Sequence, residues 1–282
     1  MSPGGAGPGQ QSLARAPGTS LRLASFNLLS GRSLADGRID PARLSAAVAS
    51  LDADILAVQE VDRGQERSGG HDQAADLAAA TGAHEHKYVE TVHGTPGMDR
   101  WLPSDPVIEG TGPGYGIALL SRVPVLEWHV LRMGAGPGRY PIPIPGRARV
   151  LWLRDEPRAV VAAVLAEPRL TVAGTHLSFV PGYNVWQLRR ATRWLARLPA
   201  PRLLLGDLNM TLALARRVSG WAPLVAAPTF PSPSPKLQLD HVLGHGLPAG
   251  LRAAGGSRTA EISDHLPLVV DLTFAHQPSR KR

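Results

Sequence analysis

Short apolar runs alternate with turns along most of the chain, and several of these runs stop at a polar side chain. The segment LLLG at 203–206 leads directly into Asp207 and Asn209. A buried strand that ends in this way carries a carboxylate and an amide to the edge of a rigid scaffold. The same arrangement recurs at 26–31, 58–62, 174–178, 239–243 and 263–268. The pattern predicts a site built from polar groups at strand ends.

The remaining pattern predicts a strand-rich fold with three helices. A helix begins at Asp40 and Pro41, because Asp is a favoured N-cap and Pro suits the first helical position. Further helices are predicted at about 71–80 and 183–198. Strands are predicted at 21–26, 54–58, 115–120, 125–131, 150–153, 159–166, 170–175, 202–205, 238–243 and 266–274. Since the chain has no internal repeat, this composition predicts two packed β-sheets with helices outside.

Two stretches rich in Gly and Pro, 93–114 and 134–146, are predicted as surface loops. The predicted domain spans 21–275, after a disordered leader at 1–20 and before a basic tail at 276–282. With 282 residues, 43% of them hydrophobic, the chain is long enough for one large domain.

Composition narrows the classes of function and location. No apolar run approaches the roughly 20 residues of a membrane span, so stable membrane insertion is not expected. The chain has no Cys, which removes disulfides and thiolate metal sites. Its N-terminal stretch lacks the apolar region of a signal peptide. A cytoplasmic location is therefore expected, and no obligate protein partner is indicated.

The net charge of +7 alone does not identify a nucleic-acid-binding protein. Four positive charges lie in the predicted leader and tail, which leaves +3 for the domain. The helix at 183–198 carries arginines on one face, at Arg189, Arg190, Arg193 and Arg197. That stripe could bind phosphate, although a solvated helix face is the favoured interpretation.

The oxygen-bearing side chains at the strand ends suit Mg²⁺, with Mn²⁺ as an alternative, better than zinc. They are Asn27, Glu60, Asp207, Asn209 and Asp264. Glu60 follows the run ADILAVQ and is either a metal ligand or a solvated strand end. Asp207 and Asn209 point the same way if strand geometry continues between them. The alternative is an Asx turn that closes the strand.

Two histidines also follow apolar runs, His176 in GTHLS and His265 in SDHLPL. A lone histidine near a strand end is more often structural than catalytic. Here Asp240, in LDHVL, offers a carboxylate that could orient His265 and keep it charged beside a developing oxyanion. The sequence contains neither a GxSxG elbow nor a GxxxxGK[ST] phosphate loop.

The order of these motifs, Asn, Gln-Glu, Gly-Thr-His, Gly-Asp-Leu-Asn, Asp-His and Ser-Asp-His, resembles the endonuclease/exonuclease/phosphatase superfamily with its deoxyribonuclease-I-like fold. The resemblance covers about 21–274. It implies a four-layer α/β sandwich in which two mixed sheets are flanked by helices. It also implies cleavage of a phosphate ester by in-line attack of a metal-assisted water.

Carried over to this chain, the resemblance implies a role for each motif residue. Glu60 would bind Mg²⁺ with Asn27 beside it, and Asp264 would support the metal or the phosphate. Asp207 would deprotonate the water, and His265, paired with Asp240, would stabilise the transition state. The residues implied to hold the phosphoryl group are Asn209, His176 and, with less support from its motif, Arg158.

The THLS segment is similar to the branch that holds sphingomyelinase-like phosphodiesterases, inositol-phosphate phosphatases and bacterial metal-dependent hydrolases. Three hypotheses remain open. The first is a Mg²⁺-dependent phosphoesterase acting on a small or lipid-derived phosphate ester, and the second is a nuclease acting on DNA or RNA. The third is a non-catalytic binding module, which the complete set of site residues disfavours. The two loops would select the substrate.

Overall fold

The computed structural model describes residues 20–97, 101–143 and 150–274. Apart from Ser20, the predicted leader lies outside these ranges, as does the predicted basic tail. Within the described ranges, the helices lack the length and apolar character needed to cross a membrane.

The larger β-sheet has seven strands in the order β14, β15, β1, β2, β5, β3, β4. They are β1 (Ser20–Asn27), β2 (Ile55–Arg63), β3 (Glu85–His93), β4 (Leu102–Pro103), β5 (Gly114–Ser121), β14 (Arg252–Ser257) and β15 (Leu268–Thr273). β1 and β2 pair in parallel, while the other neighbours are antiparallel. The sheet is therefore mixed.

The second sheet has six strands in the order β12, β13, β11, β10, β9, β6. They are β6 (Val125–Met133), β9 (Arg158–Leu165), β10 (Thr171–His176), β11 (Arg202–Asp207), β12 (Ala222–Pro223) and β13 (Asp240–His245). Here β10 and β11 form the parallel pair. A separate antiparallel ribbon consists of β7 (Arg139–Pro143) and β8 (Val150–Arg154).

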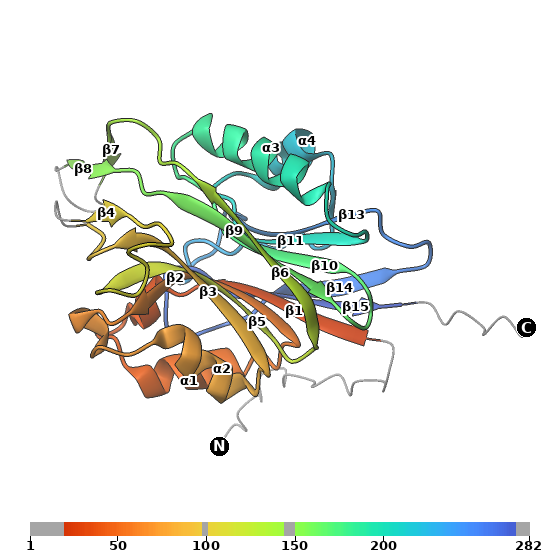
Figure 1. Cartoon of the computed structure of the whole chain (residues 1–282), viewed down its shortest axis with the longest axis horizontal. Helices are drawn as coiled ribbons and strands as arrows, with labels where there is room; N and C mark the ends of the chain where they lie inside the picture. The colour runs from red at the N-terminus through yellow and green to blue at the C-terminus, as the bar shows by residue number, and fades with distance from the viewer. Residues whose placement is uncertain (1–19, 98–100, 144–149, 275–282) are drawn as a thin grey trace, which may run out of the picture.

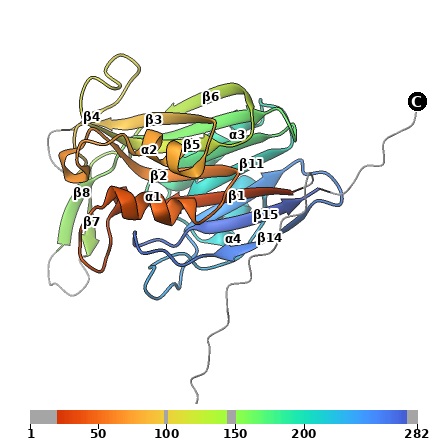
Figure 2. The same cartoon turned by 90° about the horizontal axis from the view of Figure 1, so that it is seen from below.

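Four α-helices cover the outer faces of the sheets, as Figures 1 and 2 show. α1 (Pro41–Ala49) and α2 (Gln73–Thr81) lie on the seven-stranded sheet, and α3 (Tyr183–Leu195) and α4 (Leu212–Ser219) lie on the six-stranded sheet. The predicted helix start is confirmed, because the Asp40 carboxylate accepts hydrogen bonds from the backbone N–H groups of Ala42 and Arg43. The predicted four-layer α/β sandwich is confirmed.

The central strands are buried on both faces, which explains why their sequences are continuous apolar runs. In β11, Leu203 and Leu205 face the other sheet, whereas Leu204 faces α3 and α4. In β1, Leu23 faces the other sheet and Phe26 faces α1 and α2. A strand that is buried on both faces has no polar alternation, so only its ends are free to carry polar groups.

Several regular elements were missed by the sequence pattern, among them β3, β14 and α4, besides β7 and the two-residue strands β4 and β12. β3 carries the mixed segment EHKYVETVH, and its first three residues are not buried. α4 is only eight residues long, with one buried side chain, Ala215. β14 consists of small and exposed residues that pair with β15 at the sheet edge. Each element is held by backbone pairing or by one short contact, so it leaves little hydrophobic periodicity.

Most of the described part of the first predicted loop is irregular and not buried, as predicted, but short parts of both loops pack against the sheets or form strands. Trp101 is 6% exposed and packs on Val92 and Tyr115. β4 pairs with the end of β3, and the Ser104 hydroxyl donates to the buried Glu90 carboxylate at 2.8 Å. Part of the second stretch forms β7. A high content of Pro and Gly therefore indicates irregular backbone here, but it does not exclude packing against the core.

At Gly206, which precedes Asp207, the backbone of β11 approaches the backbone of β10 too closely for any side chain. The φ of Gly206 is +148°, and a Cβ atom there would lie 1.9 Å from the Thr175 carbonyl oxygen. We expect Gly206→Ala to reduce the free energy of unfolding by roughly 2–4 kcal/mol, because the two strands must separate locally. Denaturant unfolding measures the change. Gly256→Ala is the control, since no atom lies within 4 Å of its added Cβ, and equal effects of the two variants would contradict the steric argument.

Candidate active site

A cavity of about 560 Å³ opens at one end of the sandwich, beside the carboxyl ends of the two parallel strand pairs. Eight of the nine residues predicted to form the site line this cavity. They are Asn27, Glu60, Arg158, His176, Asp207, Asn209, Asp264 and His265. The ninth, Asp240, is fully buried and reaches the cavity through its contact with His265.

Asn27, at the end of β1, joins carboxylates that come from the two different sheets. Its Nδ2 atom donates to Glu60 Oε1 at 3.0 Å and to Asp207 Oδ2 at 3.2 Å. Its Oδ1 atom accepts from the Leu29 backbone N–H at 3.2 Å. The amide is therefore fixed at both ends and holds the two carboxylates close together.

Glu60 lies at a β-bulge within β2, where the pairing with β5 shifts between Gln59 and Val61. Its φ is +58°, in the left-handed region. A bulge re-aims a side chain out of the regular alternation, and here it turns Glu60 into the cavity. The predicted strand end at Gln59 and Glu60 is thus an interruption, because β2 continues to Arg63.

Asp207 and Asn209 reach the cavity by a route other than the one expected from strand periodicity. β11 ends at Asp207, and Asn209 has a φ of +49°. The Asn209 backbone N–H donates to Asp207 Oδ1 at 2.9 Å, so the two residues form the turn that the sequence offered as the alternative. The Asn209 amide then donates to the Leu177 carbonyl oxygen at 3.0 Å. The expectation of continued strand geometry was wrong, although both residues line the cavity.

His265 and Asp240 form the predicted pair. The Nδ1 atom of His265 lies 2.8 Å from Asp240 Oδ2, and its Nε2 atom lies 3.7 Å from Asp207 Oδ2. Burial disfavours the charged imidazole, but attraction to Asp240, its hydrogen bond and attraction to Asp207 outweigh burial and raise the pKa of His265 to about 10. At neutral pH this side chain is an imidazolium.

His176 has the opposite character. Its Nδ1 atom lies 3.1 Å from Nη1 of the buried Arg158, so it accepts a hydrogen bond and the ring is neutral. Burial, together with the charges of Arg158 and His265, lowers the pKa of His176 well below its usual range. The Nε2 atom lies 3.4 Å from the Asn209 amide nitrogen and 3.6 Å from Asp207 Oδ2. One neutral and one cationic imidazole therefore lie near the same carboxylate, each just beyond hydrogen-bond distance from it.

The carboxylates of the cavity are hard to ionise without a cation. Burial raises the pKa of Glu60 to about 7, and the nearby Glu156 and Asp264 add to this shift against the hydrogen bond from Asn27. Burial likewise raises the pKa of Asp207 to about 6, although attraction to His265 opposes the rise. Accumulated negative charge of this kind is the environment that a divalent cation offsets.

A second geometric candidate for a metal ion involves Asp207, Asp240 and His265, which offer ligand atoms within 4.8 Å of one another. The Oδ1 atom of Asp240 is buried and has no hydrogen-bond partner among the described residues. His265 is an imidazolium whose Nδ1 contacts Asp240, so its Nε2 atom could bind a metal only after losing a proton. The carboxylate oxygens of Asp207 and Asp240 are the donors of this group that suit a divalent ion.

Sequence reasoning missed Glu156 and Arg67, which also line the cavity. Glu156 lies 3.7 Å from Arg158, and burial raises its pKa while the charge of Arg158 opposes the rise. Arg67 donates two hydrogen bonds to the buried Asp62, at 2.7 and 2.9 Å, and one to Ser30. Arg67 lies in a short 3-10 helix (Glu66–Ser68) and Glu156 in a loop between β8 and β9, and no hydrophobic run marks either position.

The arrangement defines a class of protein, an α/β sandwich with a polar site at the ends of two central parallel strand pairs. Comparison with known families identifies it: residues 24–265 match the Endonuclease/Exonuclease/phosphatase family. The chain belongs to this family, whose members are hydrolases acting on phosphoesters. A search of curated proteins finds no match.

Solved structures agree with the fold. An endonuclease/exonuclease/phosphatase from Beutenbergia cavernae DSM 12333 has a TM-score of 0.64 and 22% identity, covering 93% of this chain and 73% of its own. Sphingomyelinase C from Streptomyces griseocarneus has a TM-score of 0.59, 19% identity and coverages of 89% and 99%. A mannosyl-6-phosphatase from Bacteroides thetaiotaomicron has a TM-score of 0.57, 18% identity and coverages of 90% and 100%. At these identities the likeness shows the fold alone.

The substitution Asp240→Asn tests whether Asp240 raises the pKa of His265. Loss of the Asp240 charge removes the largest attraction that raises the pKa of His265, while burial still lowers it. We expect the pKa to fall from about 10 by several units, as measured by NMR titration of the imidazole. Asp271→Asn, far from the site in β15, should leave it unchanged. A pKa that stays above 9 in Asp240→Asn would show that another group holds the charge.

Proposed function

We propose that this protein is a Mg²⁺-dependent phosphoesterase that hydrolyses a phosphodiester or phosphomonoester by in-line attack of water. The observation that carries the proposal is the convergence of Glu60, Asp207, His176 and His265 on one cavity, with Asn27 connecting the two carboxylates. Phosphoryl transfer requires alignment and charge neutralisation more than covalent chemistry. The cavity offers carboxylates for a metal and cationic or N–H donors for phosphoryl oxygens.

Glu60 is the proposed metal ligand, with Asn27 orienting it and Asp264 supporting the metal or the phosphate. Mg²⁺ is favoured, with Mn²⁺ as an alternative, because the available ligands are mainly oxygens. When bound, the ion would polarise the phosphate and neutralise the charge that develops on it. The crowding of Glu60, Glu156 and Asp264, seen in the raised pKa of Glu60, supports a cation at this place.

The chain's own residues supply the proton transfer and the positioning. Asp207 accepts the proton of the attacking water, and a pKa of about 6 suits a base that works near neutral pH. His265, kept cationic by Asp240, stabilises the charge of the transition state. His176 and Asn209 hold the phosphoryl group, and Arg158 adds a buried positive charge behind His176.

Cleavage of DNA or RNA is the second candidate function. It is favoured by the five arginines that line the cavity, Arg32, Arg67, Arg139, Arg154 and Arg158. Solved neighbours are named as a sphingomyelinase, a mannosyl-6-phosphatase and a 2',3'-cyclic phosphatase, so the fold accommodates varied phosphate esters. A non-catalytic binding module is disfavoured, because the full set of polar groups converges. The cytoplasmic location stays a prediction.

Hydrolysis of a chromogenic phosphodiester and nicking of plasmid DNA, both in Mg²⁺, test the proposed function. We expect the wild type to hydrolyse the ester, and Asp207→Asn to lower kcat by about 10²–10⁴ while the folded structure is retained, since the amide keeps the shape and removes the base. Near-wild-type turnover in Asp207→Asn would remove Asp207 as the base. Nicking by the wild type that is lost in the variant would select the nuclease hypothesis, and ester hydrolysis without nicking would select the small-substrate one.

Glu60→Gln tests the metal site by thermal stability. In metal-free protein the pKa of Glu60 rises from 4.5 to about 7, so its ionisation destabilises the folded state as pH increases through that window. The melting temperature of Glu60→Gln minus that of wild type, both measured in EDTA, should therefore be more positive at pH 8 than at pH 5.

The same variant should lose most of the increase in melting temperature that Mg²⁺ causes at pH 8. Glu66→Gln, an exposed carboxylate in the short turn after β2, is the control and should behave as wild type. An undiminished Mg²⁺ effect in Glu60→Gln would place the ion elsewhere.

A further inference from the structure

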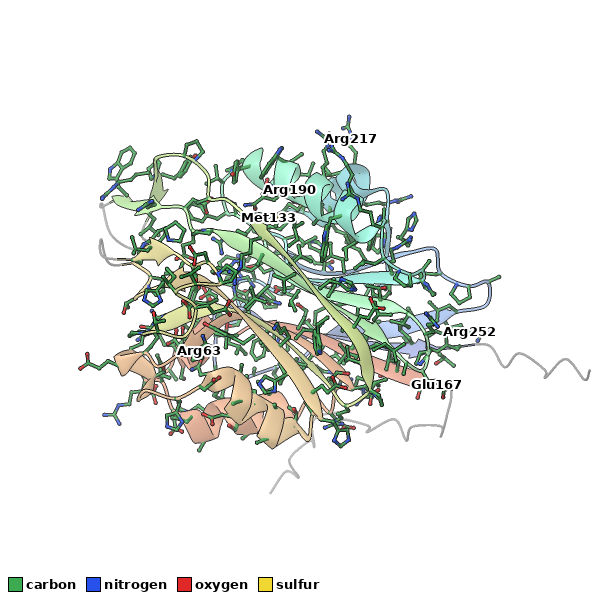
Figure 3. All side chains as sticks on the ribbon, viewed as in Figure 1. Arg63, Met133, Glu167, Arg190, Arg217 and Arg252 are labelled. Carbon is green, nitrogen blue, oxygen red and sulfur yellow. The ribbon has the colours of Figure 1, made fainter. Side chains whose placement is uncertain are left out.

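The outer face of α3 and α4 carries six exposed arginines that play no part in the site. α3 and α4 contact each other on the six-stranded sheet, and Figure 3 shows Arg190 and Arg217 on that side of the molecule. The six are Arg189, Arg190 and Arg193 on α3, Arg197 in the turn just after α3, and Arg216 and Arg217 on α4. We call them the α3/α4 basic face.

The basic face has no compensating carboxylate. Residues 168–239 contain nine Lys and Arg but one acidic residue, Asp207, which is buried in the site. Since the chain has 30 Lys and Arg against 23 Asp and Glu, the other residues hold 21 against 22. This segment therefore carries a net charge of +8, while the rest of the chain, including the four positive charges of its two ends, carries −1. Among the described residues, no carboxylate forms an ion pair with the six arginines.

This lack of partners distinguishes the face from an ordinary solvated helix. Exposed helices usually intersperse opposite charges, and like charges four residues apart oppose helix formation. Arg189 and Arg193 have that spacing, which corresponds to a rise of about 6 Å along the helix axis, and Arg197 follows four residues further on, just after α3 ends at Leu195. Repulsion of this kind is relieved when an anionic partner binds.

One part of the face is held in place by aromatic contacts. Arg190 lies over the Trp186 ring at 5.4 Å, and Trp186 stacks on Tyr183 with centroids 5.2 Å apart. Trp186 is 44% exposed, so the arrangement serves a surface and not the core. A cation–π contact orients a guanidinium while leaving its N–H donors free for phosphate oxygens.

We propose that the α3/α4 basic face binds the phosphate backbone of a nucleic acid without reading its sequence. Arginine is suited to this partner because its planar fork donates two hydrogen bonds to one phosphate. An anionic lipid surface fits less well, since the large apolar side chains exposed on these helices are Trp186 and Leu214 and amphipathic membrane helices bury a broad apolar face. The apolar side of α3 is already packed in the core.

The face is connected to the catalytic end of the fold through the first turns of α3. Asn184 Nδ2 donates to the Asn209 carbonyl oxygen at 2.8 Å, and Gln187 Oε1 accepts from the Ser178 backbone N–H at 2.8 Å. A polymer held along α3 would therefore lie beside the loops that carry Asn209 and follow His176. The binding itself requires no catalysis and does not rest on the proposed function.

Fluorescence anisotropy with labelled DNA, as duplex and as single strand, tests the proposal in EDTA so that no strand is cleaved. The test variant combines Arg189→Glu, Arg193→Glu and Arg217→Glu. The control combines Lys87→Glu, Arg252→Glu and Arg258→Glu, which are exposed on or next to the seven-stranded sheet. Both variants change the net charge by the same amount, so they separate a local surface from a general charge effect.

We expect the test variant to bind DNA at least about tenfold more weakly at low salt, and the control to bind like wild type. The slope of log affinity against log salt for the duplex should fall by about two to three in the test variant, because each lost phosphate contact contributes about 0.9. Hydrolysis of the chromogenic phosphodiester should be unchanged in both variants, so loss of hydrolysis and loss of binding report on separate claims.

Three results would overturn the proposal: no DNA binding by the wild type at low salt, equal weakening by the two variants, or weakened binding to vesicles of phosphatidylserine with unchanged binding to DNA. If charge reversal lowers the melting temperature, the same three arginines changed to Gln repeat the comparison with a smaller perturbation. Their matched control is Lys87→Gln, Arg252→Gln and Arg258→Gln.

Discussion

The hydrogen bond from Asn27 to Asp207 links the two sheets, and the rest of the site is arranged around it. Asn27 ends β1 in one sheet and Asp207 ends β11 in the other, with 3.2 Å between donor and acceptor. The sheets can approach this closely because small residues face each other beneath the site. A Cβ added to Gly174 of β10 would lie 3.1 Å from the Ala57 Cβ of β2. Larger residues at these two positions would separate the sheets and thereby the carboxylates.

That close approach determines the electrostatics of the site. Groups from both sheets are brought together below the surface, so burial is the largest cause that raises the pKa values of Glu60 and Asp207. The charge of His265 opposes the rise at both carboxylates, as the second-largest cause at Asp207 and as a smaller one at Glu60. At Glu60 the charges of Glu156 and Asp264 act in the opposite direction and raise the pKa further. A bound cation would therefore offset more unfavourable charge at Glu60 than at Asp207.

The strand ends of the site could be predicted from the sequence because burial on both faces leaves a strand only its ends for polar groups. Asp207 and His176 follow uninterrupted apolar runs and end neighbouring parallel strands in register. The pairing of His265 with Asp240 was also predictable, since both follow short motifs of the same kind. The bulge at Glu60 and the left-handed turn at Asn209 were not, because no glycine marks either position. Glu156 was missed for a related reason: its segment has no periodicity.

The average composition of the chain also conceals how its charge is distributed. A net charge of +7 over 282 residues does not indicate a polyanion-binding protein. The structure changes the argument because it gathers the unpaired arginines of α3 and α4 on one face, and it buries the single carboxylate of that segment in the site. Asp207 cannot neutralise the face, since its partners are Asn27, Asn209 and the two histidines. Catalytic and surface charges are therefore separated within one segment of the chain, and a nucleic-acid-binding surface can exist beside a site that acts on a small phosphate ester.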